Sequence, residues 1–264
     1  MARRILVVEG DTPELALARR RATGGTAARR YAATLAQIDP SLSFDFAQPY
    51  FSDYAPDAFD AATYDGVVVT GSGVAWSGAD EQARPFWNLF EAAFAAGAPC
   101  FGSCWGMQTA AVVLGGETAA GPNGVEAGIA RALSPASHPM MEGRRALFDA
   151  ICMHRDDVTR APDGAVVTAT NDHTAIQAMA YDKGDVSFWG VQYHPECDLK
   201  DAAHWLAAAR DGADKAMAAD LKLIAEDPIV YARLSAKREV GLDILDRDYH
   251  VTELRNWLTK KVAS

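Results

Sequence analysis

Cysteine is scarce in this chain, and long apolar runs are missing. The four cysteines, at positions 100, 104, 152 and 197, could form two disulfides, but a chain of 264 residues can bury a core without such cross-links. No export signal is visible at the amino terminus, and no apolar run approaches the roughly 18 residues that suggest a membrane-spanning helix. We therefore expect free thiols in a soluble, cytoplasmic protein with no membrane partner.

Basic residues are outnumbered, and metal-binding motifs are absent. Lys and Arg number 25 against 35 Asp and Glu, a net charge of −10 that disfavours contact with a phosphate backbone. The chain has no Cys-x-x-Cys pair, and its histidines show no metal-ligand spacing. We expect no nucleic-acid partner, no metal and no cofactor.

Short apolar runs that alternate with helical patterns predict an α/β fold. Continuous runs at 5–8 and 66–70 are typical of buried strands of a parallel sheet, whereas the alternating run 43–47 suits a strand nearer the edge. Helices are expected from a cap at Thr26 to about residue 37, over 80–96, and over 107–114. The second would bury five residues at three-and-four spacing: Phe86, Leu89, Phe90, Ala93 and Phe94.

The pattern changes after about residue 146. Strand-like runs at 150–153, 165–170, 176–180 and 186–193 favour antiparallel hairpins appended to the parallel sheet. Helical patterns return at 202–220, 228–245 and 252–261. The simplest organisation is a domain of residues 1–200 with a helical carboxyl-terminal extension, 201–264, packed on it. This extension could dock another chain or a second copy, or add to the core.

One cysteine stands between two glycines where a strand is expected to turn into a helix, in Gly102-Ser-Cys-Trp-Gly-Met-Gln108. Glycines permit a strained turn with close backbone packing, as in the Gly-x-Ser-x-Gly hydrolases. A helix amino terminus and a nearby histidine lower the pKa of a thiol enough to supply thiolate at neutral pH. Cys104 is therefore a candidate nucleophile; the alternative is a small core residue.

A second motif, Gln192-Tyr-His-Pro-Glu196, supplies a histidine and a carboxylate. Side chains two apart in an extended segment point the same way, and Pro195 favours extension at His194. His194 would take and return a proton, while Glu196 would hold the imidazole in the useful tautomer. The alternative is a turn with a surface ion pair. With Cys104, the two residues complete a Cys-His-Glu triad.

Two glycine- or arginine-rich stretches bear on binding. A negative charge that develops on an attacked carbonyl oxygen needs fixed donors; the backbone amide of Trp105 is one, and the second is expected from Gly71-Ser72-Gly73. This loop follows the carboxyl end of its strand, where open α/β sheets place their sites.

The run Arg19-Arg-Arg21 is interpreted as a solvated helical face and loop, with binding of an anionic acceptor as the alternative.

These motifs, in this order, resemble the class I glutamine amidotransferases over roughly residues 60–200. The resemblance implies a doubly wound, mostly parallel, flavodoxin-like sheet and release of ammonia from glutamine through a glutamyl-thioester at Cys104. It also implies that Gln108 and the backbone of Gly71 to Gly73 help to hold glutamine or its oxyanion. Further matching segments are Gly115-Gly116, Gly124-Val-Glu-Ala-Gly128 and His154-Arg-Asp-Asp-Val158.

Some positions depart from the family pattern. Gly71-Ser-Gly73 stands where most members have Gly-Gly-Pro, and Ser103, Trp105 and Met107 stand where many have Ile, Phe and His. We therefore expect a pocket that accepts something other than free glutamine, with Trp105 crowding it. Together with Trp87, the loop looks more like the stand-alone, GMP-synthase-like branch, which includes γ-glutamyl peptidases.

Three hypotheses about function follow. About 60 residues of tail cannot hold a synthetase domain, and the chain has no Walker-type phosphate loop. The first hypothesis is a glutaminase or amidotransferase subunit whose ammonia is used by a synthetase or acceptor subunit, with a homo-oligomer as the other expected assembly. The second is a stand-alone γ-glutamyl hydrolase or peptidase. The third, a non-catalytic binding or regulatory protein, is disfavoured by the intact Cys104, His194 and Glu196.

Overall fold

A sheet of nine strands forms the centre of the protein, whose computed structural model describes residues 3–55, 60–208, 222, 226–227 and 244–263. The strand order is β2-β1-β3-β4-β11-β10-β9-β6-β7, and β5 and β8 form a separate antiparallel pair. The strands are β1 (Arg4–Val8), β2 (Ser43–Ala47), β3 (Gly66–Val69), β4 (Cys100–Ser103), β5 (Glu117–Ala120), β6 (Glu126–Pro135), β7 (Phe148–His154), β8 (Asp156–Arg160), β9 (Val166–Thr170), β10 (Ala178–Lys183) and β11 (Val186–Val191).

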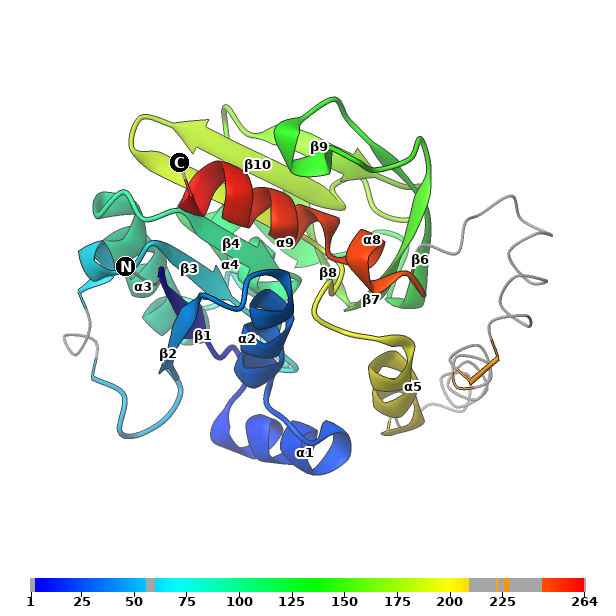
Figure 1. Cartoon of the computed structure of the whole chain (residues 1–264), viewed down its shortest axis with the longest axis horizontal. Coiled ribbons are helices and arrows are strands. Elements are labelled where there is room, and N and C mark those ends of the chain that lie inside the picture. Colours follow the sequence, from blue (N-terminus) through cyan, green and yellow to red (C-terminus); the bar gives the residue numbers. More distant parts are fainter. Residues whose placement is uncertain (1–2, 56–59, 209–221, 223–225, 228–243, 264) are drawn as a thin grey trace.

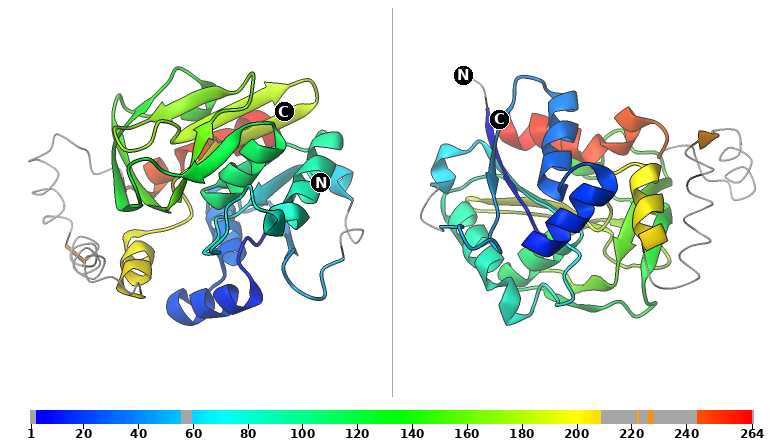
Figure 2. Two further views of the ribbon diagram at one scale, coloured as in Figure 1. Left: turned by 180° about the vertical axis from the view of Figure 1, so that it is seen from behind. Right: turned by 90° about the horizontal axis from the view of Figure 1, so that it is seen from below.

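Helices cover both faces of the parallel half of the sheet (Figure 1). They are α1 (Pro13–Thr23), α2 (Ala27–Ile38), α3 (Arg84–Ala95), α4 (Trp105–Val113), α5 (Leu199–Ala208), α8 (Arg247–His250) and α9 (Thr252–Trp257), which continues as a π-helical segment (Leu258–Val262). Figure 2 shows α3 and α4 on the face opposite to α2 and α9. The expected doubly wound α/β fold is confirmed.

The alternation of side chains along β1 explains why a hydrophobic core lies on each face of the sheet. Ile5 and Val7 belong to the core cluster that holds Tyr31 of α2, whereas Leu6 and Val8 belong to the cluster that holds Phe86 of α3. Successive side chains of a strand point to opposite faces, so a continuous apolar run feeds both cores. The expected edge position of β2 and the buried positions of β1 and β3 are confirmed.

Helix positions agree with the sequence pattern where the apolar stripe is strong. Thr26 caps α2 by accepting a hydrogen bond from the amide of Arg29, and α3 buries all five residues expected of it. The solvated helical face expected at residues 19–21 belongs to α1, whose bounds were not predicted because only Ala16 of its residues is buried. The interpretation of the arginines as solvated is correct for Arg20 and Arg21, which are exposed. It is wrong for Arg19, whose side chain is 18% exposed and pairs with Asp11.

The antiparallel half also differs in part from expectation. Strands β7, β9 and β10 lie where strand-like runs were expected, but β5, β6 and β8 were missed. Strand β6 has three alanines and a glycine but only one β-branched residue, Ile129, so its composition does not mark it as a strand. Strand β11 is antiparallel to β10 yet parallel to β4, so it joins the two halves of the sheet rather than belonging to a hairpin alone.

The carboxyl-terminal segment 244–263 packs into the core. Trp257 is fully buried, its ring centroid lies 5.9 Å from that of Phe101, and a Cβ added at Gly66 would meet the indole at 2.7 Å. Most of the expected helix 228–245, and the part of 202–220 beyond α5, lie outside the described residues. The division at residue 200 stays a prediction.

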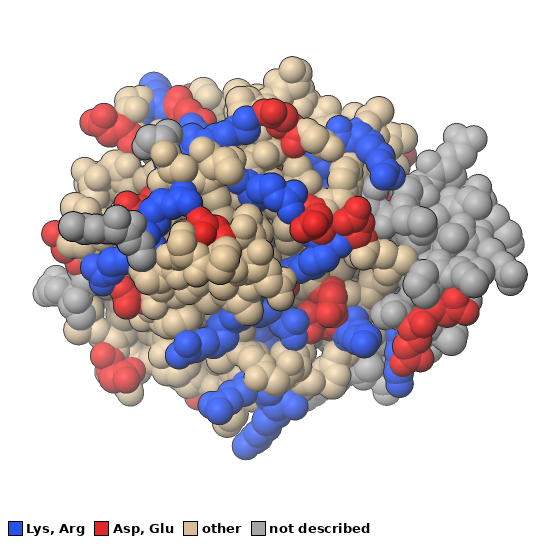
Figure 3. Space-filling model, viewed as in Figure 1, with Lys and Arg blue, Asp and Glu red and all other residues tan. Residues whose placement is uncertain are grey.

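Charge is mixed on the face seen in Figure 3, where basic and acidic side chains are interspersed. Within the residues that the structure describes, no helix has both the length and the apolar character to cross a membrane.

Candidate active site

Cys104 occupies a sharp turn between β4 and α4, with φ 49° and ψ −117°. Among the described residues it is one of two non-glycine residues with positive φ, a conformation that costs free energy and is typical of functional sites. The flanking glycines are required by packing. A Cβ at Gly106 would lie 2.4 Å from the carbonyl oxygen of Val69, and one at Gly102 would lie 2.8 Å from the backbone of Gly106. The expected strand-to-helix elbow is therefore present.

His194 and Glu196 lie just beyond the end of β11, the strand next to β4. Nδ1 of His194 is 2.8 Å from Oε1 of Glu196, and both side chains are buried. The amide of Cys104 donates to the carbonyl of Val191 at 2.8 Å, which ties the elbow to this strand. Gly71 packs against both groups, since an added Cβ would lie 2.8 Å from Cε1 of His194 and 3.3 Å from Cβ of Cys104. The fold thus brings the three predicted side chains together.

The charges of this group stabilise one another. Burial raises the pKa of the Cys104 thiol, but the hydrogen bond and charge of His194, with the charge of His154, bring it below the ordinary value. Burial lowers the pKa of His194, but the charge of Glu196 and the hydrogen bond to Cys104 raise it to about 10. Burial raises the pKa of Glu196, and His194 more than offsets this. These shifts favour a thiolate beside an imidazolium.

A second buried histidine, His154 at the end of β7, was assigned no role from the sequence. Its Nε2 lies 2.9 Å from Oε2 of Glu126, and its Nδ1 lies 3.0 Å from Oδ1 of Asp157. Burial lowers the pKa of His154, but these two carboxylates raise it to about 9. Both motifs that contain these residues appeared in the sequence resemblance, but only the contact of His154 with Glu126 and Asp157 in the fold indicates a positive charge near the thiol.

The loop after β3 is held by Asp11. Oδ1 of Asp11 accepts the amide of Gly73 at 2.8 Å and the hydroxyl of Ser72 at 3.4 Å, and Oδ2 accepts Nε of Arg19 at 2.7 Å. The Gly73 amide therefore already has an acceptor in this arrangement. That the loop of Gly71, Ser72 and Gly73 supplies an oxyanion donor stays a prediction.

Gln108 and Trp105 both point into the protein. Nε2 of Gln108 donates to the carbonyl of Asp156 at 2.5 Å and to Oε1 of Gln192 at 3.2 Å, and the side chain is buried. Its contact with substrate stays a prediction. The indole of Trp105 packs edge-on against Phe86, with ring centroids 4.8 Å apart, and is 4% exposed. The expectation that Trp105 crowds the pocket is wrong for this ring, because it fills the core beneath α3.

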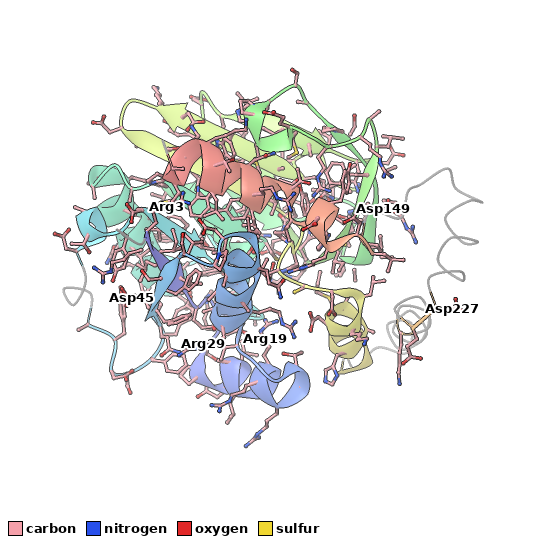
Figure 4. The ribbon with its side chains drawn as sticks, viewed as in Figure 1. Arg3, Arg19, Arg29, Asp45, Asp149 and Asp227 are labelled. Atoms are coloured by element: carbon pink, nitrogen blue, oxygen red, sulfur yellow. The ribbon has the colours of Figure 1, made fainter. Side chains whose placement is uncertain are left out.

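A pocket of about 290 Å³ adjoins His194. Its walls come from α1, the loop after β3, β7 and α5; the lining residues are Asp11, Leu15, Ala18, Arg19, Ala22, Ser72, Gly73, Met153, His194 and His204. Figure 4 shows Arg19 on the side of α1 that faces the rest of the molecule. A larger hollow of about 600 Å³, lined within residues 135–146, contains none of the predicted site residues.

His194, Glu196 and Cys197 place three metal-binding atom types within 4.8 Å of one another. However, Nδ1 of His194 already pairs with Glu196, and burial holds the pKa of Cys197 well above its ordinary value. This cluster therefore fits a histidine held by a carboxylate better than a metal centre.

Helix α8 holds the backbone of the His-Pro-Glu segment. One terminal nitrogen of Arg247 donates to the carbonyls of Pro195 and Cys197 at 2.9 and 3.1 Å. The other donates to Oγ1 of Thr34 at 2.6 Å and to the carbonyl of Glu196 at 3.4 Å. The carboxyl-terminal segment thus fixes the loop that carries His194, a contact that no local sequence pattern indicates.

Comparison with known proteins identifies the family of the chain. The family model of class I glutamine amidotransferases matches residues 44–209. The chain belongs to this family. Among solved structures with a similar fold, a glutamine amidotransferase from Thermotoga maritima matches the whole of both chains with a TM-score of 0.65 at 20% identity. One from Methylobacillus flagellatus matches 98% of this chain and 95% of its own, with a TM-score of 0.67 at 19% identity.

Two kinds of relatives differ in how much of their length they share with the chain. A γ-glutamyl-L-1-hydroxyisopropylamide hydrolase from a Pseudomonas species is 30% identical over 97% of this chain and 92% of its own length. A GMP synthase from Alcanivorax borkumensis is 31% identical over 58% of this chain, which spans only 28% of that synthase. The stand-alone, GMP-synthase-like character inferred from the sequence is consistent with both.

Proposed function

We propose that this amidotransferase-family chain cleaves the γ-amide bond of a γ-glutamyl compound through a glutamyl-thioester on Cys104. The observation that carries the proposal is the strained Cys104 at the start of α4, beside the buried His194–Glu196 pair. Positive φ aims the thiol out of the helix, and the helix amino terminus and His194 favour its thiolate.

The steps follow from these positions. The Cys104 thiolate attacks the γ-carbonyl carbon, and the amide of Trp105 with the loop at Gly71 stabilises the oxygen that becomes negative. His194 then gives its Nε2 proton to the leaving nitrogen, so the C–N bond breaks and the thioester forms. In the second half His194 takes a proton from water, which attacks the thioester and releases glutamate and the Cys104 thiolate. Glu196 holds the imidazole throughout.

Two substrates fit this chemistry, and we favour an N-substituted γ-glutamyl amide. The relative that matches nearly the whole chain is named for hydrolysis of such an amide. Free glutamine, with ammonia passed to a synthetase or acceptor subunit, is the second candidate and is supported by the matches to GMP synthases. The first candidate requires no partner, whereas the second does.

Labelling and turnover test the proposal. A glutamine-analogue electrophile should modify Cys104 in mass spectra of wild type, and Cys104→Ala should lose both labelling and turnover. Cys100→Ala is the matched control, because burial raises the pKa of that thiol far above neutrality and leaves it unreactive. A panel of glutamine and γ-glutamyl alkylamides, followed by ammonia or amine release, separates the two substrates. A folded Cys104→Ala variant that keeps wild-type turnover would contradict the proposal.

A further inference from the structure

We propose that the pocket beside His194 receives the leaving amine, and that it selects γ-glutamyl amides whose amine carries a small, uncharged, mainly apolar substituent. The proposal rests on the proposed function, since it assigns the two halves of the substrate to opposite sides of the scissile bond. Nothing in the family match identifies this pocket, because Asp11 and four residues of α1, half of the ten that line it, lie outside the matched residues 44–209.

The position of the leaving nitrogen is set by His194. Glu196 binds Nδ1 of the imidazole at 2.8 Å, so the proton for the leaving nitrogen comes from Nε2. The acyl carbon is attached to Cys104, and the leaving nitrogen must lie between the two side chains. His194 itself lines the pocket. Gly71 closes the Cε1 side of the ring, where an added Cβ would come within 2.8 Å. A substituent on the nitrogen therefore extends from His194 into the pocket.

The walls of the pocket are mainly apolar. Leu15, Ala18 and Ala22 are spaced three and four apart, so α1 presents them on one face. Leu15 packs close to the loop after β3, since a Cβ added at Gly73 would lie 3.8 Å from its methyl groups. Met153 of β7 completes this surface. The alanines leave room for a guest side chain that larger residues would exclude.

The charged residues of the pocket neutralise each other. Asp11, whose side chain is 1% exposed, holds Nε of Arg19 at 2.7 Å and also the amide of Gly73. A charged substituent would disturb this pair, whereas an apolar one only covers it. His204 of α5 stands exposed at the rim and can bond a hydroxyl group. The volume of about 290 Å³ lies at the lower end of ligand sites, which fits a small substituent.

Filling the pocket tests the assignment. Ala18→Phe and Ala22→Phe should each lower kcat/KM for γ-glutamyl isopropylamide by about tenfold or more, and leave kcat/KM for glutamine within about threefold, because the unsubstituted amide does not enter the pocket. Leu17→Phe is the matched control on the same helix, since Leu17 is 47% exposed and outside the pocket lining. Leu15→Ala enlarges the pocket, and it should raise the relative kcat/KM for a bulkier cyclohexylamide.

The outcomes separate this inference from the proposed function. Equal losses for glutamine and the isopropylamide in the filled variants, with a normal Tm, would overturn the pocket assignment while leaving the thioester chemistry intact. A wild type that prefers γ-glutamylalanine, which carries a carboxylate, over γ-glutamylalaninol would overturn the uncharged preference and point to recognition by Arg19. A folded wild type that is not labelled at Cys104 and cleaves no γ-glutamyl compound would overturn both proposals. Selective loss with the isopropylamide supports both.

Discussion

Nε2 of His250 lies 3.1 Å from the carbonyl oxygen of His194. Burial, with the charges of Arg247 and Arg144, lowers the pKa of His250 to about 3, so the ring is neutral and its Nε2 donates to that carbonyl. Because Arg247 binds the next three carbonyls, α8 holds the His-Pro-Glu segment from the outside. The carboxyl-terminal segment therefore acts on the candidate site through the backbone of His194.

Removing this support should slow turnover more than it weakens substrate binding. Arg247→Ala deletes the donors that hold the carbonyls at 195–197, and small displacements of a catalytic base cost up to about a hundredfold in rate. We expect kcat to fall about 10- to 100-fold with little change in KM. Arg255→Ala, which removes an exposed ion pair and a hydrogen bond to Asp248 but leaves the Arg247 contacts in place, is the control. Wild-type kcat in a folded Arg247→Ala variant would show that α8 does not position His194.

The regular part of the fold could be predicted because single segments determine it. The apolar runs of β1 and β3 are buried on both faces, and the spacing of Phe86, Leu89 and Phe90 marks the buried side of α3. The elbow at Cys104 could be predicted as well, since its two glycines are demanded by backbone contacts that follow directly from a strand turning into a helix.

The remaining features depend on contacts between distant segments. Val186 to Val191 has the same strand-like composition whether it pairs with one neighbour or two, so its parallel pairing with β4 could not be read from the sequence. The Asp11–Arg19 pair and the Arg247 contacts join residues whose charges look solvated in isolation. His154 similarly gains its charge only where Glu126 and Asp157 meet it.

The thiol of Cys104 should react at lower pH than an ordinary cysteine. Its pKa is depressed, so the rate of alkylation should rise through a midpoint below that of a free cysteine and then level off. Glu196→Gln removes the charge that raises the pKa of His194 most, so the midpoint should move upward. Glu91→Gln, an exposed substitution on α3, should leave it unchanged. A wild-type midpoint at or above that of a free thiol would contradict the thiolate–imidazolium pair.

The Glu126–His154 pair should make stability depend on pH. The folded pKa of His154 is about 9, above its unfolded value of about 6.5, so its contribution is full below about pH 6.5 and is lost as pH rises through 9. The folded pKa of Glu126 is lowered, so its contribution is present above about pH 4.3 and is lost as pH falls through the folded value. The contributions of His154 and Glu126 to the free energy of unfolding are therefore both present near pH 6.

Glu126→Gln should therefore lower the free energy of unfolding most near pH 6, by about 3 kcal/mol, because it leaves a buried charge with one partner fewer. Urea unfolding of wild type and Glu126→Gln at about pH 6 and pH 9.5 measures this loss in the free energy of unfolding. The loss should be smaller at the higher pH. Glu117→Gln is the control, since that side chain is 64% exposed. A loss that is equal at both pH values would mean that the pair stabilises the fold through packing rather than through charge.

A methyl group at Gly106 should disrupt the elbow. The added Cβ would lie 2.4 Å from the carbonyl oxygen of Val69, which is backbone of the central strand β3 and cannot rotate away. Overpacking usually costs about 1–3 kcal/mol, and a backbone clash places Gly106→Ala at or above the upper end. Gly25→Ala is the control, because its nearest neighbour would be 4.0 Å away. The methyl group would push the start of α4 away from β3 and so displace Cys104, and labelling should fall even in the fraction that folds. A stable, fully labelled Gly106→Ala variant would mean that β3 and α4 are not packed this closely.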